Sequence, residues 1–210
     1  MAKIGIIAGS FKPLQSGHYA LISMAARDND EVHLYVSLSD RARPGEVPIV
    51  GADMKKLWDE TIEPSLPANV TVTYGGSPIG HVYKELGDAD KAGSHDTFSI
   101  YSDPGDLKAN YATLGKYAGN LLAHGQIKLR PIERSETVNV SGTQMRQWLG
   151  VGDKVNFTKH LPKAIDRDLV WRVLSARAKD PPKDLKATDR ARGPRAEALL
   201  RHYVKLLLGR

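Results

Sequence analysis

The stretch that decides the fold runs from Ile4 to His18 and reads IGIIAGSFKPLQSGH. Its first part, Ile4 to Ala8, is a short apolar run of the kind that forms a buried strand. The chain then breaks at Gly9 and enters a helix near Gly17. A strand that ends at glycine and leads into a helix aims backbone N–H groups and a partial positive charge at one point, which favours a bound phosphate.

A second stretch of the same kind, VSGTQMR, runs from Val140 to Arg146 and follows the apolar segment Ile127–Ile132. Ser141 and Thr143 are both suitable N-cap residues, and Arg146 lies one turn inside the helix that they would start. Two strand-to-helix junctions, each suited to phosphate, predict a nucleoside triphosphate held from two sides.

Together the two stretches resemble the motifs of the nucleotidyltransferase superfamily that contains the cytidylyltransferases and the pantetheine-phosphate adenylyltransferases. The first family motif reads roughly GxFxPxHxGH and the second ISxTxxR, and they occur in the same order here. The matching residues are Gly9, Phe11, Pro13, Gly17 and His18 in the first motif, and Ser141, Thr143 and Arg146 in the second. The combination is most similar to compact, phage-encoded members described as cytidylyltransferases. Gln15 departs from the pattern, because the family has His or Thr at that position.

The resemblance implies an enzyme that transfers AMP or CMP from ATP or CTP to a small, phosphorylated acceptor and releases pyrophosphate. Such catalysis rests mainly on positioning and on neutralising the charge of the phosphates. The resemblance gives catalytic roles to His18, Lys12 and Arg146, and it implies Mg²⁺ carried in with the triphosphate instead of a protein metal site. The residues expected to bind the nucleotide are Gly9, Ser10, Phe11, Gln15, Gly17, His18, Ser141, Gly142, Thr143 and Arg146. Gln15 can donate through its amide but cannot become cationic.

Candidate acceptor contacts, besides Ser10, follow the ends of two predicted strands. Arg41 and Arg43 lie in the loop after the second strand, where a basic residue could meet a phosphate, and the spacing does not choose between them. Asp103 and Asp106 frame a turn and N-cap after the fourth strand; Asp103 could also bind a sugar hydroxyl or an acceptor amine. For the arginines, an ordinary solvated loop is the alternative.

Strands and helices alternate along most of the chain, which predicts an α/β, Rossmann-like parallel sheet with helices on both faces. In such sheets ligands bind beyond the carboxyl ends of the strands, where the strand order reverses. The expected strands are Ile4–Ala8, Glu31–Ser39, Asn69–Tyr74, Thr97–Ser102 and Ile127–Ile132. The expected helices before the second motif cover Gly17–Arg27, Asp53–Ile62, Val82–Leu86 and Asp106–Leu122.

The C-terminal quarter differs from the rest in charge. Residues 1–160 contain 17 Lys and Arg against 18 Asp and Glu, whereas residues 161–210 contain 13 against 6. We therefore predict a nucleotidyltransferase domain over residues 1–165 and a basic helical C-terminal extension over residues 166–210. The helices expected in the extension cover Ile165–Ala178 and Arg195–Leu208. The extension is a candidate contact for nucleic acid, and a solvated helical surface is the commoner alternative.

Composition fits a protein of the cytoplasm, either of a bacterium or of an infected host cell. The 210 residues are 41% hydrophobic and 26% charged, and the lack of cysteine excludes disulfides and thiolate metal sites. The first apolar run is too short for a signal peptide, and no stretch approaches the length of a membrane span, so no membrane partner is expected. The seven histidines lack the spacing of metal ligands. Dimers and hexamers both occur in families of this type, which leaves a homo-oligomer open.

Two alternatives from other classes stay open at this point. The first is a degenerate family member that binds nucleotide or nucleic acid without efficient turnover, which Gln15 and the basic extension would explain. The second is a fragment of a class I aminoacyl-tRNA synthetase, which shares the logic of the first motif. That reading is disfavoured, because the chain is short and lacks a KMSKS-like lysine loop.

Overall fold

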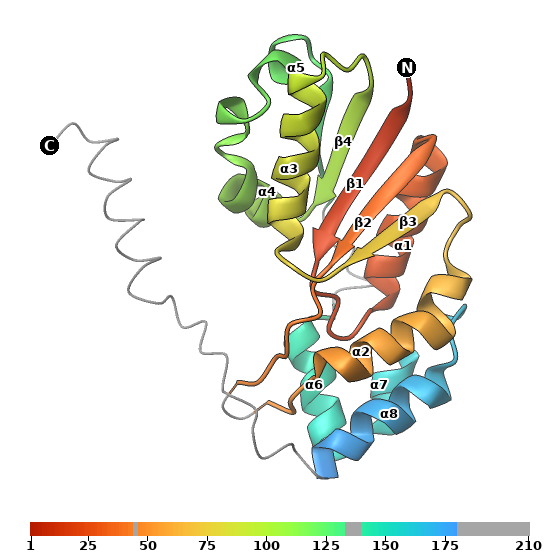
Figure 1. Ribbon diagram of the computed structural model, residues 1–210. Helices are drawn as coiled ribbons and strands as arrows, with labels where there is room; N and C mark the ends of the chain where they lie inside the picture. Colours follow the sequence, from red (N-terminus) through yellow and green to blue (C-terminus); the bar gives the residue numbers. More distant parts are fainter. Residues whose placement is uncertain (44–45, 133–139, 180–210) are drawn as a thin grey trace, which may run out of the picture.

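A five-stranded parallel sheet with the strand order β3-β2-β1-β4-β5 forms the centre of the molecule (Figure 1). The structure is a computed structural model that describes residues 1–43, 46–132 and 140–179. The strands are β1 Lys3–Gly9, β2 Glu31–Val36, β3 Val70–Tyr74, β4 Thr97–Ser102 and β5 Ile127–Pro131. The predicted α/β, Rossmann-like class is therefore confirmed, and the strand order reverses between β1 and β4.

Helices cover both faces of this sheet, as predicted (Figure 1). One face carries α1, and the other carries α3, α4 and α5. These helices are α1 Ser16–Asp28, α3 Pro78–Lys91, α4 Pro104–Tyr111 and α5 Gly119–Ala123. Side chains of β1 alternate between the two layers, since Ile7 packs in one core with Ile22 of α1, whereas Ile6 packs in the other with Val82 and Leu86 of α3.

A third group of helices lies beyond the carboxyl ends of the strands, in the lower part of Figure 1. It consists of α2 Gly51–Leu57, with a π-helical turn Trp58–Ile62 and a 3₁₀ turn Glu63–Ser65, and of α6 Gly142–Val151, α7 Lys154–Lys159 and α8 Arg167–Lys179. This group closes the end of the sheet at which the site was predicted.

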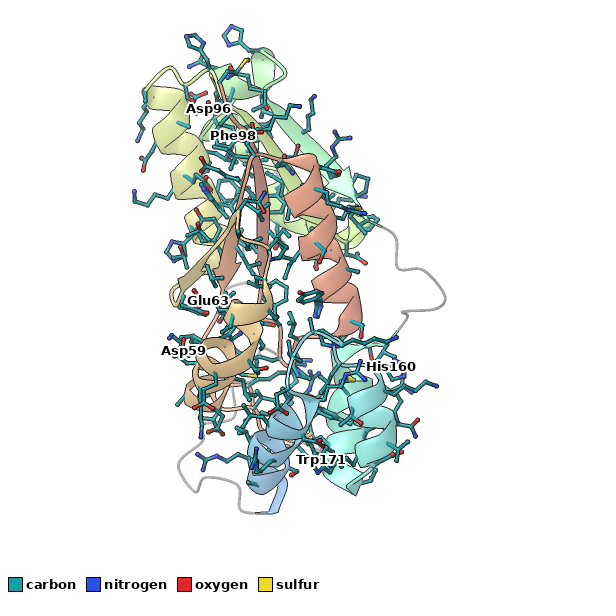
Figure 2. The ribbon with its side chains drawn as sticks, turned by 90° about the vertical axis from the view of Figure 1, so that its right-hand side faces the viewer. Asp59, Glu63, Asp96, Phe98, His160 and Trp171 are labelled. Atoms are coloured by element: carbon teal, nitrogen blue, oxygen red, sulfur yellow. The ribbon has the colours of Figure 1, made fainter. Side chains whose placement is uncertain are left out.

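Helix α8, which begins the predicted C-terminal extension, packs on α2, α6 and α7. Its side chains Val170 and Leu174 are buried in the core that also holds Phe157. Trp171, which is labelled in Figure 2, contacts the Phe157 ring edge to face. Arg177 Nε donates to an Asp53 carboxylate oxygen at 2.7 Å. The start of the extension is thus part of the packed core. The predicted helix over Arg195–Leu208 lies outside the described residues.

The single helix predicted over Asp106–Leu122 is wrong. The chain instead forms α4, a 3₁₀ turn Leu114–Lys116 and α5. Glycines in this stretch weaken a continuous helix. In addition, the Asp90 carboxylate on α3 accepts a hydrogen bond from the backbone N–H of Leu121 at 2.7 Å, which replaces the bond that a continuous helix would make.

The second predicted strand is also shorter than expected, because β2 ends at Val36 and not at Ser39. Beyond it the chain turns towards α2, and the carbonyl oxygen of Leu38 lies where a Cβ of Gly51 would be, only 1.7 Å away. The backbone N–H of Gly51 donates to the Asp40 carboxylate at 2.7 Å. Gly51 is therefore the residue that lets the loop after β2 approach the start of α2. Within the described ranges, no helix has the length and apolar composition needed to cross a bilayer.

Candidate active site

A cavity of about 590 Å³ lies at the carboxyl ends of β1 and β4, where the strand order reverses. This is the position at which doubly wound sheets bind ligands. Its walls come from the loop after β1, from α1, from the loop after β4 and from the start of α6. The two sequence motifs, which are far apart in the chain, therefore meet at one cavity.

Most of the predicted site residues line this cavity. They are Gly9, Ser10, Phe11, Lys12, Gln15, Gly17, His18, Arg41, Asp103, Gly142, Thr143 and Arg146. Ser141 and Arg43 are not among the lining residues. Arg43 is exposed, so of the two arginines between which the spacing could not choose, the structure brings Arg41 to the cavity.

The loop after β1 is shaped around the buried ring of Phe11. Phe11 has a φ of 45°, in the left-handed region, and its ring contacts His18 and Trp58 edge to face at centroid distances of 5.1 and 6.1 Å. A Cβ on Gly9 would come within 2.9 Å of the same ring. Gly9 and Phe11 therefore set the path of the loop, and the Phe11 ring packs against the ring of His18.

His18 is held in a defined orientation at the start of α1. Its Nδ1 accepts a hydrogen bond from the backbone N–H of Gln15 at 3.2 Å. Because Nδ1 accepts, the neutral ring carries its proton on Nε2. This is the tautomer in which the ring can donate a hydrogen bond to a phosphate oxygen.

Gln15 joins the two motifs. Its side chain is buried, and its amide, oriented so that both ends are satisfied, donates to the carbonyl of Val140 at 2.7 Å and accepts from the N–H of Gly142 at 3.0 Å. Gln15 was predicted among the nucleotide-binding residues, and it lies in the cavity wall. Both ends of its amide also contact the backbone of the second motif.

The start of α6 has the predicted cap. The Ser141 hydroxyl accepts a hydrogen bond from the N–H of Gln144 at 3.1 Å, so Ser141 is the N-cap residue and Thr143 is not. Gly142 lies against the side chain of Arg146, since a Cβ there would be 2.9 Å from Nη1. The close approach lets the arginine fold back towards the first motif.

Arg146 is 3% exposed and is bonded on three sides. Nη1 donates to the carbonyl of Lys12 at 2.9 Å, Nη2 to the hydroxyl of Thr143 at 3.1 Å, and Nε to Oε2 of Glu46 at 2.7 Å. The first of these bonds is a second link between the two motifs.

Lys12 is similarly buried, at 5% exposure. Its ammonium donates to the carbonyl oxygen of Ser39 and lies 3.5 Å from the hydroxyl of the same residue, in the loop after β2. The loops after β1 and β2 are thereby tied together next to the cavity.

Glu46 is a residue that sequence reasoning missed. Its Oε2 atom also accepts from Nε of Arg41 at 3.4 Å, so one carboxylate contacts two arginines of the cavity wall. Burial alone would raise the pKa of Glu46, but the guanidinium groups of Arg146 and Arg41 hold that pKa below its ordinary value. Burial, together with the charges of Arg146 and Arg43, lowers the pKa of Arg41. The sequence offered only a weak signal for the role of Glu46, namely an acidic residue three positions after Arg43 in a predicted loop.

The loop after β4 contributes acidic groups. Asp103 caps α4 by accepting from the N–H of Gly105 at 2.9 Å, which confirms the expected turn and cap, although the helix starts at Pro104 and not at Asp106. Asp103 and Asp106 both line the cavity. Carboxylate oxygens are suitable ligands for a hard divalent cation such as Mg²⁺. Among the described residues, no group of three or more His, Cys, Asp or Glu side chains could hold a metal by itself.

The segment after α6 supports the first motif. The carbonyl of His160 accepts hydrogen bonds from both the backbone N–H and the hydroxyl of Ser16, each at 2.9 Å. The His160 ring stacks on Trp148 of α6, and Figure 2 shows it at the lower end of α1. The carbonyl of His160 therefore helps to fix where α1 begins.

The chain was compared with known proteins by sequence and by structure. No protein-family model matches it, and a search of curated proteins finds no match either. Among solved structures, it is similar to a bifunctional NMN adenylyltransferase/ADP ribose pyrophosphatase from Francisella tularensis, with a TM-score of 0.54, 13% identity and coverage of 86% of this chain and 51% of that chain. This chain thus spans about half the length of the Francisella protein.

A nicotinic acid mononucleotide adenylyltransferase from Plasmodium falciparum, complexed with APC, gives a TM-score of 0.54 at 15% identity, covering 82% of this chain and 96% of that chain. A second structure of the Francisella protein, complexed with AMP and a manganese ion, gives a TM-score of 0.51 at 13% identity. The match covers 100% of this chain and 57% of that chain. At such low identity these similarities concern the fold alone, which is α/β and Rossmann-like in this chain.

Proposed function

We propose that this protein is a nucleotidyltransferase that transfers AMP or CMP from ATP or CTP to a small, phosphorylated acceptor and releases pyrophosphate. One observation carries the proposal: His18, Lys12, Arg41 and Arg146 converge, with the N-termini of α1 and α6, on the cavity at the reversal of strand order. The similarity to adenylyltransferases supports it at the level of the fold.

In this reaction an oxygen of the acceptor phosphate attacks the α-phosphorus. The bond from that phosphorus to the oxygen leading to the β-phosphate breaks, and pyrophosphate leaves. The protein has to orient the two phosphates and offset negative charge on the atoms that separate. His18 would donate from Nε2 to the α- or β-phosphate, and the positive ends of the helix dipoles at the N-termini of α1 and α6 would attract the triphosphate. Mg²⁺ bound to the phosphates would offset further charge, near Asp103 and Asp106.

The acceptor would lie beside the loops after β2 and β4. Ser10, Arg41 and Asp103 line the cavity and offer a hydroxyl, a cation and a carboxylate. Such a set suits a phosphorylated compound that carries a sugar or an amine. Since the structural neighbours include NMN and nicotinic acid mononucleotide adenylyltransferases, these two mononucleotides are the first acceptors to test.

Calorimetry tests the proposal directly. ATP, CTP and GTP would be titrated with Mg²⁺ into the wild-type protein, into His18→Ala and into His124→Ala, a control at an exposed histidine outside the cavity wall. We expect one triphosphate to bind selectively, His18→Ala to weaken it, and His124→Ala to match the wild type. Pyrophosphate release should then require an acceptor and fall about 100-fold or more in His18→Ala.

If no triphosphate binds the wild-type protein at about millimolar concentration, the proposal is contradicted. If a triphosphate binds but no acceptor leads to pyrophosphate release, the nucleotide-binding protein without efficient turnover becomes the better account. That alternative is favoured by Gln15, which stands where the family has His or Thr and whose amide is engaged with Val140 and Gly142.

A further inference from the structure

The carboxylate of Glu46 forms ion pairs with two arginines of the proposed phosphate site. Arg146 and Arg41 line the cavity, and Glu46, which is not part of its wall, contacts Nε of both at 2.7 and 3.4 Å. The side chain of Arg146 is 3% exposed, that of Arg41 is 23% exposed and that of Glu46 is 13% exposed. Ion pairs this far from water are weakly screened.

The loop that carries Glu46 is anchored at both ends. Arg41 and Ile49 form an antiparallel bridge, with backbone hydrogen bonds of 2.8 and 2.9 Å, and the N–H of Glu46 donates to the carbonyl of Arg43 at 3.1 Å. Glu46 is therefore delivered to the arginines by the local backbone and is not a long side chain that happens to reach them.

Glu46 is not required to orient Arg146. The guanidinium is already held by the Lys12 carbonyl and the Thr143 hydroxyl, which fix its plane from two sides. What Glu46 adds is negative charge, on the Nε edge that phosphate oxygens also use when they bind arginine. A carboxylate on that edge offsets the attraction that the arginine would exert on an incoming polyphosphate.

We propose that Glu46 is an internal counter-anion that weakens the affinity of the cavity for polyphosphate. The inference rests on the proposed function and concerns the regulation of the same site. Pyrophosphate has the highest charge density of the expected ligands, and it must leave after each transfer. A site with Arg146 and Arg41 uncompensated would retain it, whereas the Glu46 carboxylate keeps binding reversible.

The test compares the binding of inorganic pyrophosphate, with Mg²⁺, to the wild type, Glu46→Gln and Glu85→Gln. Glu85 is a matched control, because its side chain is 16% exposed, its carboxylate contacts His33 and Tyr35 at 2.6 and 2.8 Å, and it lies outside the cavity wall. We expect Glu46→Gln to bind pyrophosphate about tenfold more tightly than the wild type. Glu85→Gln, which loses the same charge elsewhere, should match the wild type.

Thermal unfolding supplies a second readout. Glu46→Gln leaves a buried guanidinium without its counter-ion, so its melting temperature should fall without ligand and rise more on adding pyrophosphate than that of the wild type. Glu46→Asp, whose shorter side chain cannot reach both arginines equally, should also bind pyrophosphate more tightly than the wild type. This variant tests the inference if Glu46→Gln does not fold.

The outcomes separate the two proposals. If the wild type binds ATP or CTP and the Glu46 variants bind pyrophosphate equally or more weakly, the counter-anion inference is overturned while the proposed function stands. If only the Glu46 variants bind pyrophosphate, the inference is supported, and Glu46 weakens the affinity for pyrophosphate more than expected. If neither the wild type nor any variant binds pyrophosphate or triphosphate, both proposals are overturned.

Discussion

The Nε atom of Arg146 lies 2.7 Å from the Oε2 atom of Glu46, across a separation of 100 residues in the chain. The arginine of the second motif is therefore paired with a carboxylate in the loop after β2. The same arginine donates to the carbonyl of Lys12 in the first motif at 2.9 Å. One buried guanidinium thus connects α6 to the loops after β1 and β2, and its removal should destabilise this part of the protein.

Arg146→Met should destabilise the protein by about 3–5 kcal/mol, because it leaves the Glu46 carboxylate half-buried beside a weaker partner, Arg41. The double variant Glu46→Gln/Arg146→Met should recover about 1–3 kcal/mol of that loss. Urea unfolding of the wild type, Glu46→Gln, Arg146→Met and the double variant measures the coupling energy between the two side chains. Lys84→Met, which breaks the fully exposed pair of Lys84 with Asp88, should leave the free energy of unfolding unchanged. Strict additivity of the two substitutions at Glu46 and Arg146 would contradict the pairing.

Gln15→Ala should lower the free energy of unfolding by about 1–3 kcal/mol, because the carbonyl of Val140 and the N–H of Gly142 lose their partner in a buried position. Gln147→Ala, at an exposed position on α6, is the matched control and should change little. Nucleotide binding, measured by calorimetry, should weaken in Gln15→Ala, since the start of α6 is no longer fixed relative to α1. An unchanged stability would mean that the amide does not join the two motifs.

Gly51→Ala should destabilise the protein by about 2 kcal/mol or more, because a Cβ at that position would collide with the carbonyl oxygen of Leu38. Chemical denaturation measures the loss. Gly119→Ala is the control, since nothing lies within 4 Å of its Cβ position, and it should stay within about 1 kcal/mol of the wild type. Equal effects of the two substitutions would show that the loop after β2 does not approach α2 as described.

His33 should make stability depend on pH. The hydrogen bond that His33 donates to the Glu85 carboxylate, opposed by burial and aided by Glu31, raises the pKa of His33 above its ordinary value of 6.5. The stabilisation is therefore complete below the ordinary value and is lost as the pH rises through the raised pKa. The free energy of unfolding of the wild type, measured between about pH 5 and about pH 9, should therefore contain a component that declines towards high pH. This component should be absent in His33→Gln.

His160 provides the control of opposite sign. Burial, with the charge of Lys159, lowers the pKa of His160, so its contribution is present at high pH and is lost as the pH falls. His160→Gln should therefore make the decline towards high pH steeper, whereas His33→Gln makes it shallower. Identical pH profiles for both variants would contradict the assignment of the two shifts.

Local sequence signals were sufficient where a short segment decides its own structure. The apolar run before Gly9 predicted a buried strand, Ser141 predicted a helix cap, and the alternation of strands with helices predicted the parallel sheet. They failed over Asp106–Leu122. The local pattern there favours one helix, but the N–H of Leu121 donates a hydrogen bond to the carboxylate of the distant Asp90, which favours a new helix start. No local pattern records such a contact.

The sequence by itself determined the sheet class, the two phosphate-suited junctions and most of the candidate residues that line the cavity, because strand pairing, capping and glycine turns depend on neighbours within a few positions. Only the tertiary structure decided what these residues contact. Gln15 binds the backbone of the second motif, Arg41 and not Arg43 lines the cavity, and Glu46 offsets the charge of Arg146. Each of these outcomes depends on loops from different strands meeting at one end of the sheet, where burial makes unpaired charges and amides unfavourable and so selects their partners.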